Sequence, residues 1–199
     1  MKKKLVILTA VIAVFVTTVG VIQINSNQIS QISESKSTYG IDINDTSARI
    51  GFSDYVFVGE IIEKVGTEYR HYAKEQNGND ITGTGSPYTE YKVKIIENIK
   101  GDLPLNDELT FFQAGGLTED KQNIEIYEGD ELMEENNAYI IKISVQPDET
   151  LLASGSNNNT QININAKSGL SSNKEYQEYL VNMDSAEEFE RERFEIVYE

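Results

Sequence analysis

The chain has 199 residues, no cysteine and one histidine, and its formal net charge at neutral pH is −16. The absent cysteines exclude disulfides and a lipid-modified cysteine, and together with the single histidine they exclude the usual zinc sites. The acidity makes nucleic acid a poor partner, because binding to phosphates depends on clustered Lys and Arg.

An apolar segment follows three lysines at the N-terminus and occupies residues 5–22 without a charge. Lysines beside such a segment stay in the cytoplasm, so the rest of the chain is predicted to lie outside. A helix of these residues would be about 27 Å long against a hydrocarbon core of roughly 30 Å. Residues 1–22 are therefore a signal peptide or a signal-anchor helix. The absence of an Ala-x-Ala cleavage site favours the retained anchor, with a single-pass protein in the cell membrane; cleavage would give a secreted one.

Residues 23–45 are rich in Asn, Ser, Gln and Ile and are interpreted as a polar tether, whose isoleucines could add an edge strand. Residues 46–199 are long enough to form one domain with its own hydrophobic core. A short helix is predicted at 45–52, with Ala48 and Phe52 facing inward.

Alternating apolar residues predict a series of strands after this helix. The first is at 55–65, with Gly59 at the position of a bulge. The second, at 88–100, has apolar residues on one face and charged residues on the other. In the fourth strand, at 138–145, apolar residues alternate with Lys142 and Ser144. The remaining strands are expected at 108–113, 138–145 (the fourth), 151–153 and 161–165, and together they suggest a barrel or a sandwich.

Helices are predicted near the C-terminus. Ser172 and Glu175 have the spacing of a capping box, and an apolar stripe follows them at helical intervals. Ser185 and Glu188 repeat this spacing before a second, charged helix that would pair Glu187 with Arg191. The stripe of the first helix consists of Tyr176, Tyr179, Leu180 and Met183.

Four segments of the chain carry a resemblance to a known family. They are SDYVFVGEIIEKVG at 53–66, YTEYKVKIIENIKGDLP at 88–104, ELTFFQAGG at 108–116 and EGDELMEENNAYIIKI at 128–143. Their order resembles small exported proteins of Gram-positive bacteria whose function is unknown, and it is remotely similar to netrin and metalloproteinase-inhibitor modules. The resemblance implies a small OB-like, netrin-module-like β-barrel. Protease inhibition is not implied, because the inhibitory edge of those modules depends on cysteines that this chain lacks.

Candidate catalytic and metal-binding residues are few. His71 is the only histidine and lies in a polar loop without a nucleophile motif, so it is interpreted as a solvated loop residue. Residues 42–53 begin like a calcium loop but lack its glycine and its final glutamate. The carboxylates at 128–131 and 148–149 are expected at turns and rims. No catalytic residue, metal site or cofactor is predicted.

The most distinctive binding surface is the loop at 66–87, because loops of that length are usually functional or disordered. In an OB-type barrel the loop between the first two strands flanks the ligand face. The alternative to a binding surface is that the loop is only a mobile hairpin tip. The aromatic and basic residues that make this loop a binding candidate are Tyr69, Arg70, His71, Tyr72 and Lys74.

These observations favour a non-catalytic, extracytoplasmic binding or interaction module of the bacterial cell envelope. Its partner would be a protein, a peptide or an envelope polymer, in addition to the membrane that the N-terminal segment contacts. Two alternatives remain open. One is an envelope hydrolase that uses a pair of carboxylates, which would require two close acids with one raised pKa. The other is the ectodomain of a larger membrane assembly.

Overall fold

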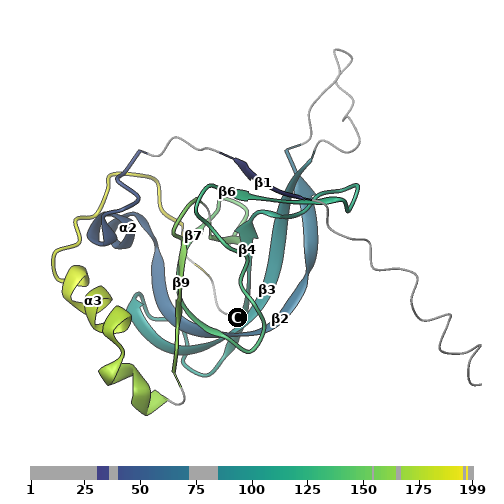
Figure 1. Ribbon diagram of the computed structural model, residues 1–199. Helices are drawn as coiled ribbons and strands as arrows, with labels where there is room; N and C mark the ends of the chain where they lie inside the picture. Colours follow the sequence, from purple (N-terminus) through teal and green to yellow (C-terminus); the bar gives the residue numbers. More distant parts are fainter. Residues whose placement is uncertain are drawn as a thin grey trace, which may run out of the picture.

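The computed structural model describes residues 31–35, 40–71, 85–153, 155–164, 167–194 and 196. It is mainly β, and its helices lie together on one side of the strands (Figure 1). The predicted hydrophobic segment at 1–22 and residues 72–84 of the predicted loop lie outside the described residues. Among the helices of the described part, none has the length and apolar character needed to span a membrane.

The larger sheet has the strand order β2-β3-β4-β8-β7-β9, and β2 also pairs with β7. The pairings therefore run in a ring from β2 through β3, β4, β8 and β7 back to β2. Within this ring β4 and β8 are parallel, and the other neighbours are antiparallel. The strands are β2 (Tyr55–Arg70), β3 (Ser86–Lys100), β4 (Glu108–Ala114), β7 (Ala138–Val145), β8 (Leu151–Ala153) and β9 (Asn159–Ile162).

Each of the six predicted strands has a counterpart in the structure. The hairpin strands β2 and β3 are longer than the pattern indicated, reaching Arg70 and Ser86, and β9 begins two residues before the predicted 161–165 segment and ends at Ile162. A second, three-stranded sheet has the order β1-β6-β5. Its strands β5 (Gly116–Leu117) and β6 (Asn123–Tyr127) were not predicted. Its edge strand β1 (Gln31–Ser35) comes from the segment interpreted as a tether and runs parallel to β6.

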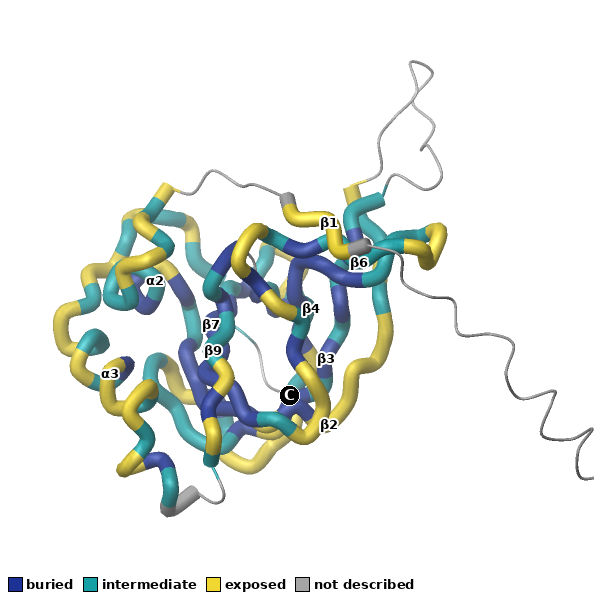
Figure 2. Tube along the Cα trace, in the orientation of Figure 1, coloured by how far each residue is buried: buried dark blue, intermediate teal, exposed yellow. Residues whose placement is uncertain are grey.

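Two apolar layers hold the sheet and the helices together. β2 contributes to both, because Phe57 and Ile61 belong to the cluster inside the ring whereas Val56 and Val58 belong to the cluster under the helices. This double burial explains the apolar run at the start of β2 (Figure 2). The outer cluster is covered by α2 (Thr46–Phe52) and α3 (Lys174–Met183), which contributes Tyr179.

Gly59 allows β2 to bend. The β2–β3 register shifts between Val58 and Gly59, as the predicted bulge requires. A Cβ on Gly59 would collide with Val93 of the facing strand. The glycine is therefore needed for close approach as well as for the bend.

The two α-helices begin at side-chain caps. Asp45 accepts hydrogen bonds from the amides of Ser47 (2.8 Å) and Ala48 (3.2 Å) at the start of α2. The prediction that Phe52 faces inward is wrong, since this side chain is 39% exposed while Ile50 is fully buried.

The N-cap of α3 is one residue later than predicted. Asn173 accepts from the Tyr176 amide at 2.9 Å, and Ser172 ends a 3₁₀ helix, η1 (Lys167–Ser172). Asn and Ser are both preferred N-cap residues, and here Asn173, one residue after Ser172, starts the helix. The buried face of α3 includes Tyr179, as the predicted apolar stripe required.

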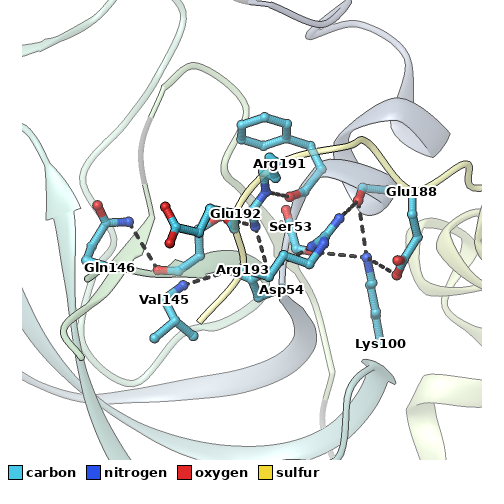
Figure 3. Close-up of polar contacts among 12 residues, drawn as sticks. Ser53, Asp54, Lys100, Val145, Gln146, Glu188, Arg191, Glu192 and Arg193 are labelled. Atoms are coloured by element: carbon cyan, nitrogen blue, oxygen red, sulfur yellow. Dashed lines mark hydrogen bonds and ion pairs between the residues drawn. The ribbon is translucent and has the colours of Figure 1, made fainter. Parts of the chain in front are cut away.

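The prediction of a second C-terminal helix is wrong. Residues 186–194, here called the C-terminal strap, contain no helix. Arg191 does not form the expected helical pair with Glu187. Instead it donates to Asp54 (2.6 Å), as does Arg193 (2.7 Å) (Figure 3). The strap brings two guanidinium groups to one carboxylate, whereas the helical pair that it replaces would contribute only a few tenths of a kcal/mol.

Candidate functional site

The outer face of β3 and β4 carries two aromatic rings that share one guanidinium group. The Cζ atom of Arg70, at the end of β2, lies 4.3 Å from the ring centroid of Phe112 and 5.2 Å from that of Tyr88. The register explains the meeting, because Glu68 pairs with Tyr88 across β2–β3 and Glu90 pairs with Phe112 across β3–β4. Residues two apart on a strand share a face, so all these side chains lie on one surface.

This surface forms a shallow, open groove of about 650 Å³. We call it the Arg70 groove. Its floor is formed by the strands, and one wall is the turn that joins β7 to β8. The groove is lined by Glu68, Arg70, His71, Tyr88, Phe112, Gln146, Pro147, Asp148, Thr150 and Leu152.

Glu68 holds the guanidinium of Arg70 in place. Its two carboxylate oxygens accept from Nε and Nη2 of Arg70, each at 3.1 Å. A forked pair of this kind fixes the plane of the guanidinium. Each cation–π contact adds about 0.5 to 2 kcal/mol, depending on how far it is desolvated. Glu68 and the two rings therefore hold Arg70 in one orientation.

The wall of the groove presents a charged carboxylate. Asp148 Oδ1 accepts from the hydroxyl of Thr150 at 2.7 Å and from its amide at 3.2 Å. The hydrogen bond from the hydroxyl has the largest effect in lowering the pKa of Asp148, and the one from the amide follows. The charge of Arg70 lowers this pKa further. The groove therefore places an anionic oxygen within the electrostatic reach of a fixed cation.

His71 and Tyr88 form the end of the groove nearest the hairpin. Their rings meet edge to face with centroids 5.9 Å apart. The backbone of His71 is left-handed, with φ of 57°, and its side chain is exposed, as predicted. Burial raises the pKa of the Tyr88 hydroxyl, and the charge of Arg70 opposes this rise. Tyr88 is thus a protonated hydrogen-bonding group at neutral pH.

The structure brings together only part of the predicted binding loop. Arg70 and His71 lie in the groove, whereas the Tyr69 hydroxyl donates to the carbonyl of Thr118 (3.3 Å), between β5 and β6. The predicted residues Tyr72 and Lys74 lie outside the described residues.

The groove residues Tyr88 and Phe112 were not predicted. Strand alternation indicates that one of the adjacent rings Phe111 and Phe112 faces outward, but the structure was needed to show that Phe111 is the buried one.

Asp130 differs from the expectation of a rim carboxylate. It is only 7% exposed, and burial raises its pKa. Its oxygens accept from the side-chain amides of Gln113 (3.2 Å), Asn158 (3.0 Å) and Asn159 (3.5 Å). Through these hydrogen bonds the Asp130 carboxyl group joins β4 to the turn before β9. We therefore interpret Asp130 as a residue that stabilises the fold.

Chemically, the Arg70 groove combines stacking surfaces with hydrogen-bonding groups. It can hold a planar or extended group by contact with the rings, while Asp148, Gln146 and the Tyr88 hydroxyl orient its polar atoms. Within the part of the chain that the structure describes, no three His, Cys, Asp or Glu residues are grouped as a metal site would require. No protein-family model matches the chain, and no curated protein sequence matches it either.

Proposed function

We propose that this chain is a non-catalytic, extracytoplasmic binding module of the bacterial cell envelope. Its Arg70 groove would take an extended peptide or glycan segment. The observation that carries the proposal is the fixed stack of Arg70 on Phe112 and Tyr88 within a concave surface. Placement outside the cytoplasm rests on the lysines and the apolar segment at 5–22.

The position of the groove on the sheet supports a binding role. The strand pairings run β2-β3-β4-β8-β7-β2, with β4 and β8 parallel, which is compatible with an OB-like barrel whose five strands in chain order are β2, β3, β4, β7 and β8. OB barrels bind ligands on the face of their second and third strands, between the loops that join strands one to two and four to five. Tyr88 and Phe112 lie on β3 and β4, and His71 and Asp148 lie in the two matching connections.

The charges of the groove narrow the class of ligand. Arg70 is balanced by Glu68, and Asp148 adds a further negative charge. A polyanion such as nucleic acid would meet net repulsion from both the groove and the chain, whose net charge is −16. A neutral or weakly charged polymer that stacks and forms hydrogen bonds is favoured.

The hydrolase alternative receives less support. It requires an acid of raised pKa that is free to donate its proton. Asp130 has the raised pKa, but its oxygens are engaged by three amide side chains. The ectodomain alternative instead predicts a retained anchor and a partner that binds in the bilayer or along the tether at 23–45.

Co-sedimentation of the full-length chain with purified Gram-positive cell-wall sacculi tests the proposal, together with photo-crosslinking from p-benzoylphenylalanine at position 88. Phe112→Ala and Arg70→Gln should each weaken capture by about tenfold or more, as central aromatic and arginine contacts do. Leu105→Ala and Lys94→Gln are matched controls, because both residues are exposed outside the groove. Digestion of the glycan or of the peptide stems then identifies which polymer is bound.

Two results would contradict the groove as the binding surface. The first is wild-type capture by both groove variants when their melting temperatures show that they are folded. The second is a wild-type chain that neither sediments with sacculi nor crosslinks to an envelope protein.

A further inference from the structure

A second concave site lies beneath helix α2. It is a cavity of about 300 Å³ between α2, the segment that precedes it, β7 and the turn at 155–158. Leu152 borders both this cavity and the Arg70 groove, but the polar residues of the two sites differ. The volume is at the lower end of the range for small-molecule sites.

The lining of this cavity is unusual for so acidic a chain. It contains two basic side chains, Arg49 and Lys142, and none of the lining residues that the structure describes is acidic. The chain as a whole has 33 Asp and Glu residues against 17 Lys and Arg. Ser144, Ser156 and Asn157 add polar groups, and Phe52 adds an aromatic wall. The charged groups that line the cavity are therefore basic, in contrast to the chain as a whole.

Lys142 is buried without an opposing carboxylate. The residue is only 4% exposed, and its Nζ donates a hydrogen bond to the hydroxyl of Tyr179 at 2.8 Å. Among the described residues no carboxylate lies within ion-pair distance of this nitrogen. Burial, and after it the charge of Arg49, lowers the pKa of Lys142, and the charge of Asp130 opposes this change. A buried cation costs stability when it is not neutralised.

Arg49 also retains an unused donor. Its Nη1 donates to the carbonyl of Asn157 (2.7 Å), and its Nη2 donates to the hydroxyl of Thr46 (2.9 Å). Its Nε is buried and has no partner within the described part of the chain. These two hydrogen bonds hold the guanidinium at the cavity wall, where it remains close enough to Lys142 to repel its charge.

We propose that this cavity binds a small organic anion, a carboxylate with a short apolar body, whose charged end lies between Arg49 and Lys142. The anion supplies the negative charge that the two cations lack, and Phe52 and Leu152 contact its apolar part. This site is separate in chemistry from the Arg70 groove, which carries its own carboxylates.

The test uses the full-length chain in a neutral detergent with 4-fluorobenzoate as probe and 4-fluorobenzamide as its uncharged counterpart, observed by ¹⁹F NMR. The acid should bind at least about tenfold more tightly than the amide, the difference expected for charge-assisted hydrogen bonds. Lys142→Met should weaken binding of the acid by about tenfold or more for the same reason. Lys92→Met is the matched control, since Lys92 pairs with Glu108 on the surface. Its affinity for the probe should equal that of the wild type.

Three outcomes would overturn the proposal. They are absence of binding by 4-fluorobenzoate, equal affinity for the acid and the amide, and wild-type affinity in a folded Lys142→Met variant. If that variant does not fold, the backbone amide resonances of the wild type decide. Shifts at Ser144, Ser156 and Asn157 on addition of 4-fluorobenzoate support the site, and shifts confined to other residues reject it.

Discussion

Arg191 donates from Nη2 to Oδ1 of Asp54 at 2.6 Å and so ties the C-terminal strap to the start of β2. Asp54 is 6% exposed at its side chain and also accepts the Val145 amide through Oδ2 at 2.9 Å. Arg193 reaches the same Oδ1 atom. One carboxylate therefore joins the strap, β2 and the end of β7, and beyond it Phe194 packs against the inner apolar cluster.

Replacing Asp54 by asparagine should lower the free energy of unfolding by about 2 to 3 kcal/mol, because two arginines lose their counter-ion at a mostly buried position. Urea denaturation measures this loss. Trypsin should also cleave after Arg191 and Arg193 faster than in the wild type, since the strap is released. The control is Glu108→Gln, whose pair with Lys92 is about half exposed and should contribute roughly 0.5 kcal/mol or less. Equal losses in the two variants would contradict this role of Asp54.

Gly51→Ala should destabilise the protein by about 1 to 3 kcal/mol, as overpacking of a filled site does. A Cβ at this position would collide with the backbone carbonyl of Glu187 in the strap, and a backbone group cannot rotate away. The control is Gly66→Ala, because no atom lies within 4 Å of the Cβ that it would add. Thermal unfolding should show a lower midpoint for Gly51→Ala alone. A midpoint unchanged from the wild type would mean that the strap does not pack there.

Lys142→Met should raise the free energy of unfolding at neutral pH by about 1 kcal/mol or more, because an apolar side chain of similar length replaces a buried charge that has no carboxylate partner. The size of this gain depends on pH. The pKa of Lys142 in the folded state lies well below its ordinary value of 10.5, so between these two values the unfolded chain binds more protons. Wild-type stability from this group therefore rises with pH across that window.

The advantage of Lys142→Met should accordingly be greatest below the lowered pKa and should shrink as the pH approaches 10.5. Urea midpoints of the two proteins, measured in parallel from pH 7 to pH 10, give the difference directly, and other titrating groups cancel. A difference that stays constant or grows with pH would show that Lys142 is not buried in this way.

Tyr179→Phe should cost about 1 to 2 kcal/mol, because Lys142 loses the hydroxyl oxygen that accepts a hydrogen bond from its Nζ at 2.8 Å. The same hydroxyl lies 3.0 Å from that of Thr160. In the Lys142→Met background the substitution should cost less, since only the Thr160 contact remains to be lost. A double-mutant cycle by urea denaturation measures the coupling. Additive costs would mean that the Lys142–Tyr179 hydrogen bond contributes nothing.

Local pattern predicted much of the fold. Period-two alternation predicted a strand near each of the six strands of the larger sheet, although β9 begins two residues before the predicted 161–165 segment. On β7 it separated Lys142 and Ser144 from the apolar face that the structure packs into the inner cluster. The helix at Thr46–Phe52 and the bend at Gly59 also followed from neighbouring residues. The alternation was misleading at Lys142, which lies on the face opposite that cluster and is nevertheless buried under α3. A strand pattern assigns a residue to a face but does not say what covers that face.

The candidate site was predictable only in part. Arg70 and His71 were singled out by their place in an aromatic and basic loop, but the rings of Tyr88 and Phe112 come from other strands. Their meeting depends on the β2–β3 and β3–β4 registers, which no short stretch of sequence specifies. The prediction of a second C-terminal helix was wrong for a related reason. Arg191 binds Asp54, which is distant in sequence, rather than a residue one helical turn away.

Residue order along the chain therefore defined the elements of this protein, their capping and bending residues, and the polar or apolar character of each strand face. Register, coverage of the outer face by helices, and the pairing of Asp54 with the strap arose from contacts between residues distant in sequence. The physical reason is that backbone propensity and side-chain alternation act over a few residues, whereas desolvation and the approach of charges depend on what the folded chain places opposite each group.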